Sequence, residues 1–519
     1  GRIGARLNSL SATVAFQQRN IAAGEEALAA AMGHMQHGSH WLFQILQLDR
    51  GYTGGQVSTR SPVTPRIAME LYAELLRDPQ GTDWTYQPME SLAVLTSPHP
   101  ASFEHWFVIA WEGRKDHEAA LEIADRARRH RFFSSLAGGG RLQSLRWILE
   151  APDEVLDQQA RLNRQDLLAQ YPAYAALAQQ ARQLRAAVEA MPLVPAEGEP
   201  FRQFQQQFAR LGALSVQQEA ILREIAVRRE PADLVFPPLK STKQIQQELP
   251  EGNVLLAFFA AGGNLYGFLM NGEQYDYWQV KGTPLLGKRI VALLRAMGHF
   301  EENRELSLKD LSDPAWKQAS KEVLDKIVEG SRADFTASFP ELVIVPDAIL
   351  WYVPFESLLV DVGGELRPLI SRFRIRYAPT ASLAVPDGRS RSPMAKTAVV
   401  LGRLFPRDDE EVAQAAFTDF TRAVSRSVAL SKPPLPAPSA LYASLLDQLV
   451  VLDDIKLEDQ GPYSWAPIPI DRGKPGNALG DWLALPWQGP DTLILPGYHT
   501  AAESSLKNVS PAAPGAEMF

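Results

Sequence analysis

The sequence contains no cysteine in its 519 residues. A chain without this residue forms no disulfide, binds no metal through thiolates and performs no thiolate catalysis. It also has no uninterrupted apolar run of about 18 residues, the length that crosses a bilayer. The nearest stretch, 253–270, is broken by Gly262, Gly263 and Asn264. We therefore expect no membrane span. Secreted and cytosolic chains can both lack Cys, so this absence identifies no compartment; the location that we expect is the cytoplasm.

Positive charge is scarcer than negative charge. The chain has 52 Lys and Arg against 60 Asp and Glu, and its net charge is −8. A nucleic-acid-binding protein shows a basic face. We therefore expect no nucleic-acid partner.

The common cofactor and metal motifs are also missing. The sequence has no dinucleotide fingerprint, no H-E-x-x-H and no G-x-S-x-G. The stretch SLAGGGR, residues 135–141, lacks the Lys-Ser/Thr ending of a phosphate-binding loop and is interpreted as a flexible turn. His34, His37 and His40 recur at three-residue intervals, but Gly38-Ser39 interrupts them, so we interpret them as surface histidines. We expect no cofactor and no metal.

Residues 1 to about 230 predict helices. Apolar residues recur there at three- and four-residue spacing, as in 69–78, 181–191 and 201–211. This periodicity is typical of helices that pack against one another.

Residues 107–133 predict a helical hairpin, with a turn at Gly113–Asp116. Ala120 and Ala124 are small enough to let a partner helix approach closely. The pair resembles a tetratricopeptide unit with part of its signature, and a generic helical hairpin is the alternative. The basic run RARRHR, residues 126–131, is interpreted as a solvated helix face.

The pattern changes after residue 230. Three prolines in 229–241 indicate a linker, which we place at 231–250. Apolar runs of strand length follow, and Asn271-Gly272 is a hairpin turn signal. The strands expected in this meander are 253–261, 264–270 and 274–280.

Further strands alternate with helices in the remainder of the chain. Residues 341–359 predict a buried strand, a Pro-Asp turn, a short second strand and a helix start. The alternation in 372–385 predicts a half-exposed strand near a sheet edge. The other segments are a helical stretch at 284–330 and buried strands at 397–402 and 447–454. Such alternation favours a mainly parallel sheet with helices on both faces.

The stretch DTLILPGYHTAAESS, residues 491–505, predicts a buried strand followed by an elbow and a helix start. Leu493, Ile494 and Leu495 form the strand, and T-x-x-E from Thr500 has the pattern of a capping box. In α/β enzymes such an elbow holds the nucleophile, and a helix N-terminus there lowers the pKa of a thiol. This elbow presents Tyr498 and His499 instead.

Two functional hypotheses arise at these strand ends. His499 is a candidate base for one of three hydroxyls, those of Ser464, Ser504 and Ser505, or a ligand-binding group. Asp453 and Asp454, at the end of the strand 447–452, are candidates for a base or a metal site. The alternatives are a polar residue at a helix start and a solvated strand end.

Two segments together resemble a known family. LVIVPDAILWYVPFESL (342–358) followed by LISRFRIRYAPTASL (369–383) is similar to the central signature of CHAT domains. These are caspase-like and separase-like peptidase domains usually appended to tetratricopeptide repeats. The resemblance covers about 240–519, with a looser match over 100–230.

The resemblance implies an α + α/β fold in two parts. We expect a tetratricopeptide-like helical region at 1–230, the linker at 231–250, and a caspase-like domain at 251–519. That domain would be mainly parallel, three-layered and truncated at its C-terminus.

Active members of this family use a His and a Cys at the ends of neighbouring strands. The Cys motif, similar to L-S-A-C-x-T, falls on Leu495 to Thr500, so the Cys position is Tyr498. The His position falls on Asp453 or Asp454. Tyrosine, with a pKa near 10, is a poor nucleophile, and aspartate does not replace imidazole as a base at neutral pH.

The resemblance therefore implies a degenerate peptidase that acts as a scaffold or sensor. It would bind a protein or peptide partner through the helical region and the former cleft. The alternative is an active peptidase or hydrolase of altered chemistry, centred on His499 or completed by residues beyond 519.

Overall fold

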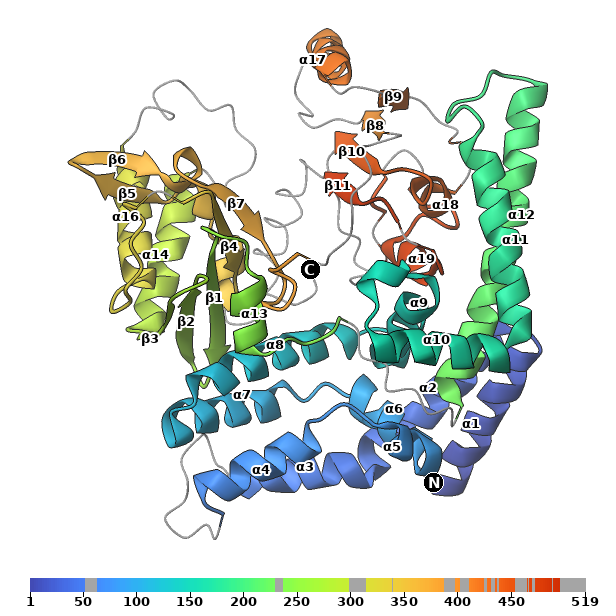
Figure 1. Cartoon of the computed structure of the whole chain (residues 1–519), viewed down its shortest axis with the longest axis horizontal. Coiled ribbons are helices and arrows are strands. Elements are labelled where there is room, and N and C mark those ends of the chain that lie inside the picture. The colour runs from blue at the N-terminus through green and yellow to red at the C-terminus, as the bar shows by residue number, and fades with distance from the viewer. Residues whose placement is uncertain are drawn as a thin grey trace.

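The computed structural model describes residues 1–51, 63–228, 237–297, 314–337, 339–386, 397–401, 410–423, 427–430, 435, 438–452, 464, 466–468, 472–487 and 489–494. Helices make up the N-terminal part and sheets with helices follow, so the predicted α + α/β class is confirmed (Figure 1).

The helical region follows local capping rules. Asn20, Thr64, Asp116 and Asp157 each accept a hydrogen bond from the backbone of the first turn that they cap. The helices are α1 Arg2–Gln17, α2 Ile21–Gly38, α3 His40–Gly51, α4 Pro65–Leu75, α5 Gly81–Tyr86, α6 Pro88–Thr96, α7 Pro100–Val108, η2 Ile109–Arg114, α8 His117–Phe133, η3 Ala137–Gly140, α9 Arg141–Glu150, η4 Asp153–Val155, α10 Gln158–Gln170, α11 Pro172–Glu189, α12 Glu199–Val227 and α13 Thr242–Glu248. None of the described helices has the length and apolarity that crossing a bilayer requires.

The predicted helical hairpin is formed by α7 and α8. A π-helical turn, η2, extends α7, and Lys115 then reverses the chain with a φ of +54°. Ala120 and Ala124 are fully buried, as close helix packing requires. Whether the hairpin is a tetratricopeptide unit stays a prediction.

The strands form two main sheets. The five-stranded sheet has the order β3-β2-β1-β4-β7; its β1–β2–β3 part is antiparallel, and β4 is parallel to both β1 and β7. The four-stranded sheet has the order β11-β10-β8-β9 with parallel pairing throughout. A two-stranded ribbon joins β5 and β6. The strands are β1 Val254–Ala261, β2 Asn264–Met270, β3 Tyr275–Val280, β4 Glu341–Val345, β5 Leu359–Val362, β6 Glu365–Pro368, β7 Arg374–Tyr377, β8 Thr397–Leu401, β9 Ser427–Leu430, β10 Gln448–Leu452 and β11 Thr492–Ile494.

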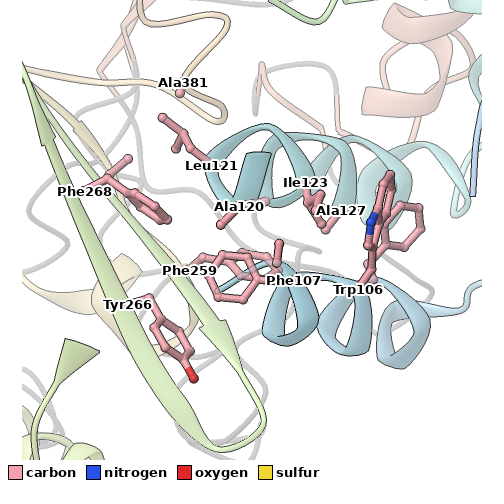
Figure 2. Packing of buried hydrophobic residues seen from close by; sticks show 14 of the residues in the cluster. Trp106, Phe107, Ala120, Leu121, Ile123, Ala127, Phe259, Tyr266, Phe268 and Ala381 are labelled. Carbon is pink, nitrogen blue, oxygen red and sulfur yellow. The ribbon is translucent and has the colours of Figure 1, made fainter. Parts of the chain in front are cut away.

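Both faces of the five-stranded sheet are covered by helices. On one face Leu256 and Phe258 pack with α14 Thr283–Ala296 and α16 Ala315–Ile327. On the other face Phe259 packs with α7 and α8 (Figure 2). The sheet and the helices on its two faces make three layers. The N-terminal helical region supplies one of the two helical layers.

The four-stranded sheet uses other helices. Val400 and Val451 pack in one cluster with Val188 of α11 and Phe208 of α12. Phe417 of α17 Glu410–Ala423 covers the opposite face. Two short helices follow in the chain, α18 Ser439–Ala443 and α19 Leu479–Ala484.

Two local predictions are wrong. Residues 348–352 form a 3₁₀ turn and not a strand, because Leu350 and Tyr352 fold back into the core below the sheet. Leu493 and Ile494 are 39% and 37% exposed rather than buried, because β11 is at the edge of the sheet that the described strands form. The half-exposed edge strand predicted in 372–385 is confirmed as β7.

The glycine-rich turn at 135–141 is more tightly packed than a flexible turn. Gly138 and Gly139 both have positive φ, +68° and +62°. A Cβ on Gly139 would lie 2.4 Å from the Leu95 side chain and 2.6 Å from its backbone, whereas a Cβ on Gly138 would meet nothing within 4 Å.

These two neighbouring glycines allow a matched test of packing. Gly138→Ala should lose about 1–2 kcal/mol of unfolding free energy, because an alanine is strained at positive φ. Gly139→Ala should lose about 1–3 kcal/mol more, because the backbone of α6 cannot yield cheaply. Urea denaturation of both variants measures the difference. Equal losses would show that the turn does yield.

Candidate functional site

The two strands that precede the predicted dyad positions are neighbours in the fold. Strands β10 and β11 pair in parallel, with Val450 opposite Ile494. Their carboxyl ends therefore reach the same edge of the sheet. Residues that follow these two strands start close together, as a catalytic pair at strand ends would need.

The residues proposed for that dyad are not placed by the structure. Asp453, Asp454, Tyr498 and His499 lie outside the described residues. Of the three serines considered as partners of His499, Ser464 is described and the other two are not. The chemistry assigned to these positions stays a prediction.

The two signature segments lie together at a second edge. Strands β4 and β7 pair in parallel, with Ile344 opposite Tyr377. The Pro-Asp turn that follows β4 and the Ala-Pro-Thr-Ala-Ser segment that follows β7 are therefore adjacent loops. Both loops contact α8, through Arg131 and Asp125.

Asp347, in the first loop, is a buried anchor that is 1% exposed. Its carboxylate accepts a hydrogen bond from the backbone N–H of Ala260, at 2.9 Å. Its second oxygen accepts from Nη1 of Arg131, also at 2.9 Å. This side chain therefore joins β1, the turn after β4 and the helix α8.

Asp125 of α8 holds the second loop. This carboxylate is also 1% exposed. It accepts hydrogen bonds from the backbone N–H groups of Ala381 and Ser382, at 2.8 and 2.7 Å, and from the Ser382 hydroxyl at 2.9 Å. Arg128, one turn along α8, donates to it at 3.2 Å. We call the contacts of Asp125, Arg128 and Arg131 with these loops the α8 clamp.

The interpretation of residues 126–131 as a solvated helix face is wrong, because part of this run is buried. Arg128 and Arg129 are each only 7% exposed. Carboxylates from distant parts of the sequence compensate the buried charges. Asp347 lies close to Arg128, and Asp78 forms an ion pair with Arg129. The Arg128 guanidinium also lies 5.5 Å from the centre of the Phe259 ring.

Sequence reasoning missed Asp125, although a signal was present. Leu121, Asp125 and Arg128 are spaced by four and three residues, so they share one face of α8 with buried side chains. A charged residue on an apolar stripe is costly unless it is paired, which indicates a buried polar anchor.

A further polar pair joins the end of β7 to the turn before β5. The hydroxyl of Tyr377 donates to the Glu356 carboxylate at 2.9 Å. Burial of the ring and the charge of Glu356 raise the pKa of Tyr377. The phenol therefore stays protonated at neutral pH.

The clamp is suited to holding loops rather than to catalysis. The Ser382 hydroxyl donates to Asp125 and accepts from the backbone N–H of Lys240, so both of its roles are taken. Within the described ranges, no group of three or more His, Asp or Glu side chains is arranged to hold a metal ion.

Comparison with known protein families gives one match, and the matched segment contains both signature loops. Residues 308–486 match the family model of the CHAT domain. The matched span runs from before α16 to the end of α19 and contains both signature loops and β10. No curated protein matches the chain.

Proposed function

We propose that this CHAT-domain chain is a non-catalytic relative of the caspase-like peptidases and works as a protein-binding scaffold or sensor. The observation that carries the proposal is the absence of cysteine from all 519 residues. Thiolate attack on a carbonyl needs that side chain. Tyr498 at the nucleophile position and aspartates at the base position supply neither part of the dyad.

The α8 clamp supports a sensor. A protein or peptide partner would bind the helical region and the former cleft. Because α8 belongs to the helical region and holds both signature loops, a partner that displaces α8 would also displace those loops. Asp125 and Arg131 are the side chains through which this would occur.

A cleavage assay tests the proposal. The purified chain is incubated with a diverse peptide library, and cleavage products are identified by mass spectrometry. We expect no cleavage above that of a His499→Ala variant, because the chain lacks the thiolate. The variant is a matched control, since it removes the remaining ring base and leaves the CHAT match intact.

Cleavage by the natural chain that disappears in His499→Ala would overturn the proposal. That result would favour the alternative, a hydrolase of altered chemistry centred on His499. A second variant, Tyr498→Phe, then shows whether the phenol takes part.

A further inference from the structure

The first helix of the chain, α1, leaves a row of large apolar side chains exposed. The row consists of Ile3, Leu7, Leu10 and Val14, which are between 49% and 79% exposed. None of the four belongs to a cluster of buried hydrophobic residues in the described part of the chain. We call these four residues the α1 stripe. Exposed apolar patches of this kind mark interaction sites.

The opposite face of α1 holds the helix in the fold. Ala5, Ala12 and Phe16 are buried, and at about 100° per residue they lie on the side of the helix opposite the α1 stripe. Phe16 packs with Val227 of α12, and a Cβ on Gly24 of α2 would lie 2.2 Å from its ring. Figure 1 shows α1 at the outer edge of the helical region. The α1 stripe is therefore not needed to attach α1 to the rest of the protein.

The spacing of the α1 stripe favours a helix as its occupant. Its residues are separated by four, three and four positions, which is the a/d pattern of a two-heptad coiled-coil seam. Gly4 and Ser11, exposed along one side of the seam, are small enough to let a partner helix approach closely. A helix that lies on a membrane surface has a broader apolar face and more basic residues than α1 has.

The charges of α1 indicate which kind of helix fits. The helix contains Arg2 and Arg6, both on the other side of the seam, and no Asp or Glu. The Arg6 side chain is exposed and has no hydrogen bond or ion pair with another described residue. Arg2 donates to the backbone carbonyl of Gly38, at 3.3 Å. We call Arg2 and Arg6 the basic flank.

The described carboxylates of the neighbouring helices lie elsewhere. In α2 the acidic residues are Glu25 and Glu26, next to Gly24 and therefore beside the C-terminal end of α1. Glu224 of α12 accepts a hydrogen bond from Gln17, again at that end of α1, and is paired with Arg228. The basic flank is therefore open to carboxylates from another molecule.

We propose that the α1 stripe binds one helix of a partner protein, with apolar residues in matching heptad positions and carboxylates along its flank. The apolar side chains would pack against the stripe, and the carboxylates would pair with the basic flank. A second α1 does not offer this match, because it brings arginines and no carboxylate. The inference rests on the proposed role of the helical region in binding a protein partner, and it names the kind of partner.

Binding of designed peptides tests this surface. Two three-heptad peptides carry Leu at the a and d positions and differ only at e and g, which are Glu in one peptide and Lys in the other. Like charges at e and g oppose pairing of each peptide with itself. Fluorescence anisotropy of each labelled peptide is followed as the full chain is added. We expect saturable binding of the Glu peptide, and an affinity for the Lys peptide that is about tenfold lower or less.

Substitutions at exposed positions locate the binding. Leu7→Gln should lower the affinity for the Glu peptide about tenfold or more, because it places a polar group in the seam. Val216→Gln is the control: Val216 is about as exposed as Leu7 but lies on α12, so affinity should stay unchanged. Arg6→Glu should reverse the preference, so that the Lys peptide binds more tightly than the Glu peptide. Since all three side chains are exposed, the urea midpoints of the variants should match that of the natural chain.

Several results would overturn the proposal. Absence of binding by the Glu peptide, or equal affinity in Leu7→Gln and Val216→Gln, would place no partner helix on the stripe. An unchanged preference in Arg6→Glu would contradict the role of the basic flank. A dimer in sedimentation that Leu7→Gln abolishes would assign the stripe to a second copy, and binding to phosphatidylserine vesicles that Leu7→Gln abolishes would assign it to a membrane. None of these results alters the cleavage assay, so the two proposals fail separately.

Discussion

Replacing Asp125 with asparagine should lower the free energy of unfolding by about 3–5 kcal/mol, the range for breaking a buried ion pair from one side. The substitution leaves the Arg128 guanidinium, 6% exposed, without its carboxylate partner on α8. It also places an amide group against the N–H groups of Ala381 and Ser382, which need an acceptor. Denaturation in urea, followed by intrinsic fluorescence, measures the loss.

The chain provides a closely matched control. Asp419 and Arg422 form the same pairing of aspartate with an arginine three residues later on a helix, at 3.3 Å, with side chains 77% and 76% exposed. Asp419→Asn should change stability by less than about 1 kcal/mol, because solvent screens an exposed pair. Similar losses of unfolding free energy in the two variants would mean that Asp125 stabilises the fold no more than a surface ion pair does.

Hydrogen exchange adds a local readout to the same comparison. In Asp125→Asn the backbone amides of 378–385 should exchange faster, since two of them lose a charged acceptor. The amides of β1, in the middle of the sheet, should be less affected. Unchanged exchange in 378–385 would contradict the role given to Asp125.

The sequence was sufficient to predict the strands that lie in continuous apolar runs. Such runs are short and bounded by Gly, Pro, Asn or Asp, so their ends are marked by chemistry that acts locally. The strands predicted in this way are β1, β2, β4, β8 and β10. Strand β3 was predicted instead from the alternation in 274–280 and the Asn271-Gly272 turn before it. The edge position of β7 was also predictable, since its arginines alternate with apolar residues; Arg374 and Arg376 pair with the buried Glu341.

The α8 clamp could not be predicted, because its partners are far apart in the chain. Asp125 and Ser382 are separated by 257 residues, and Arg131 and Asp347 by 216. Spacing along one helix shows which side chains share a face but not which distant loop meets that face. A basic run without visible partners therefore resembles a solvated surface, although here it is mostly buried.

For the candidate dyad, the strands that precede it are the part that the structure describes. Adjacency of the strands before Asp453 and before Tyr498 follows from the resemblance and agrees with the pairing of β10 with β11. The exposure of β11 did not follow, because an apolar run of three residues has the same pattern at the edge of a sheet as at its centre.

The second large effect is expected at Phe107, in the interface between α7 and the five-stranded sheet. This ring is fully buried, and its centre lies 4.7 Å from that of Phe259 and 5.0 Å from that of Tyr266 (Figure 2). Phe107→Ala should lower the unfolding free energy by about 3–5 kcal/mol, because it removes apolar contacts and leaves a cavity. Phe43→Ala is the control: Phe43 is 54% exposed on α3, and its loss should stay near 0.5 kcal/mol.

The manner of unfolding is as informative as the loss. Because one cluster of buried side chains includes Phe107 and Leu121 from the helices and Phe259 from β1, the hairpin and the sheet should unfold as one cooperative unit. Far-ultraviolet circular dichroism and fluorescence should then report coincident transitions, both shifted to lower urea in Phe107→Ala. If instead the sheet kept its midpoint while the helices unfolded earlier, α7 and α8 would be a detachable layer. A partner could then affect the signature loops only by detaching α8 from them. The proposed sensor would work by release of α8, and not by a shift of α8 while it stays packed against the sheet.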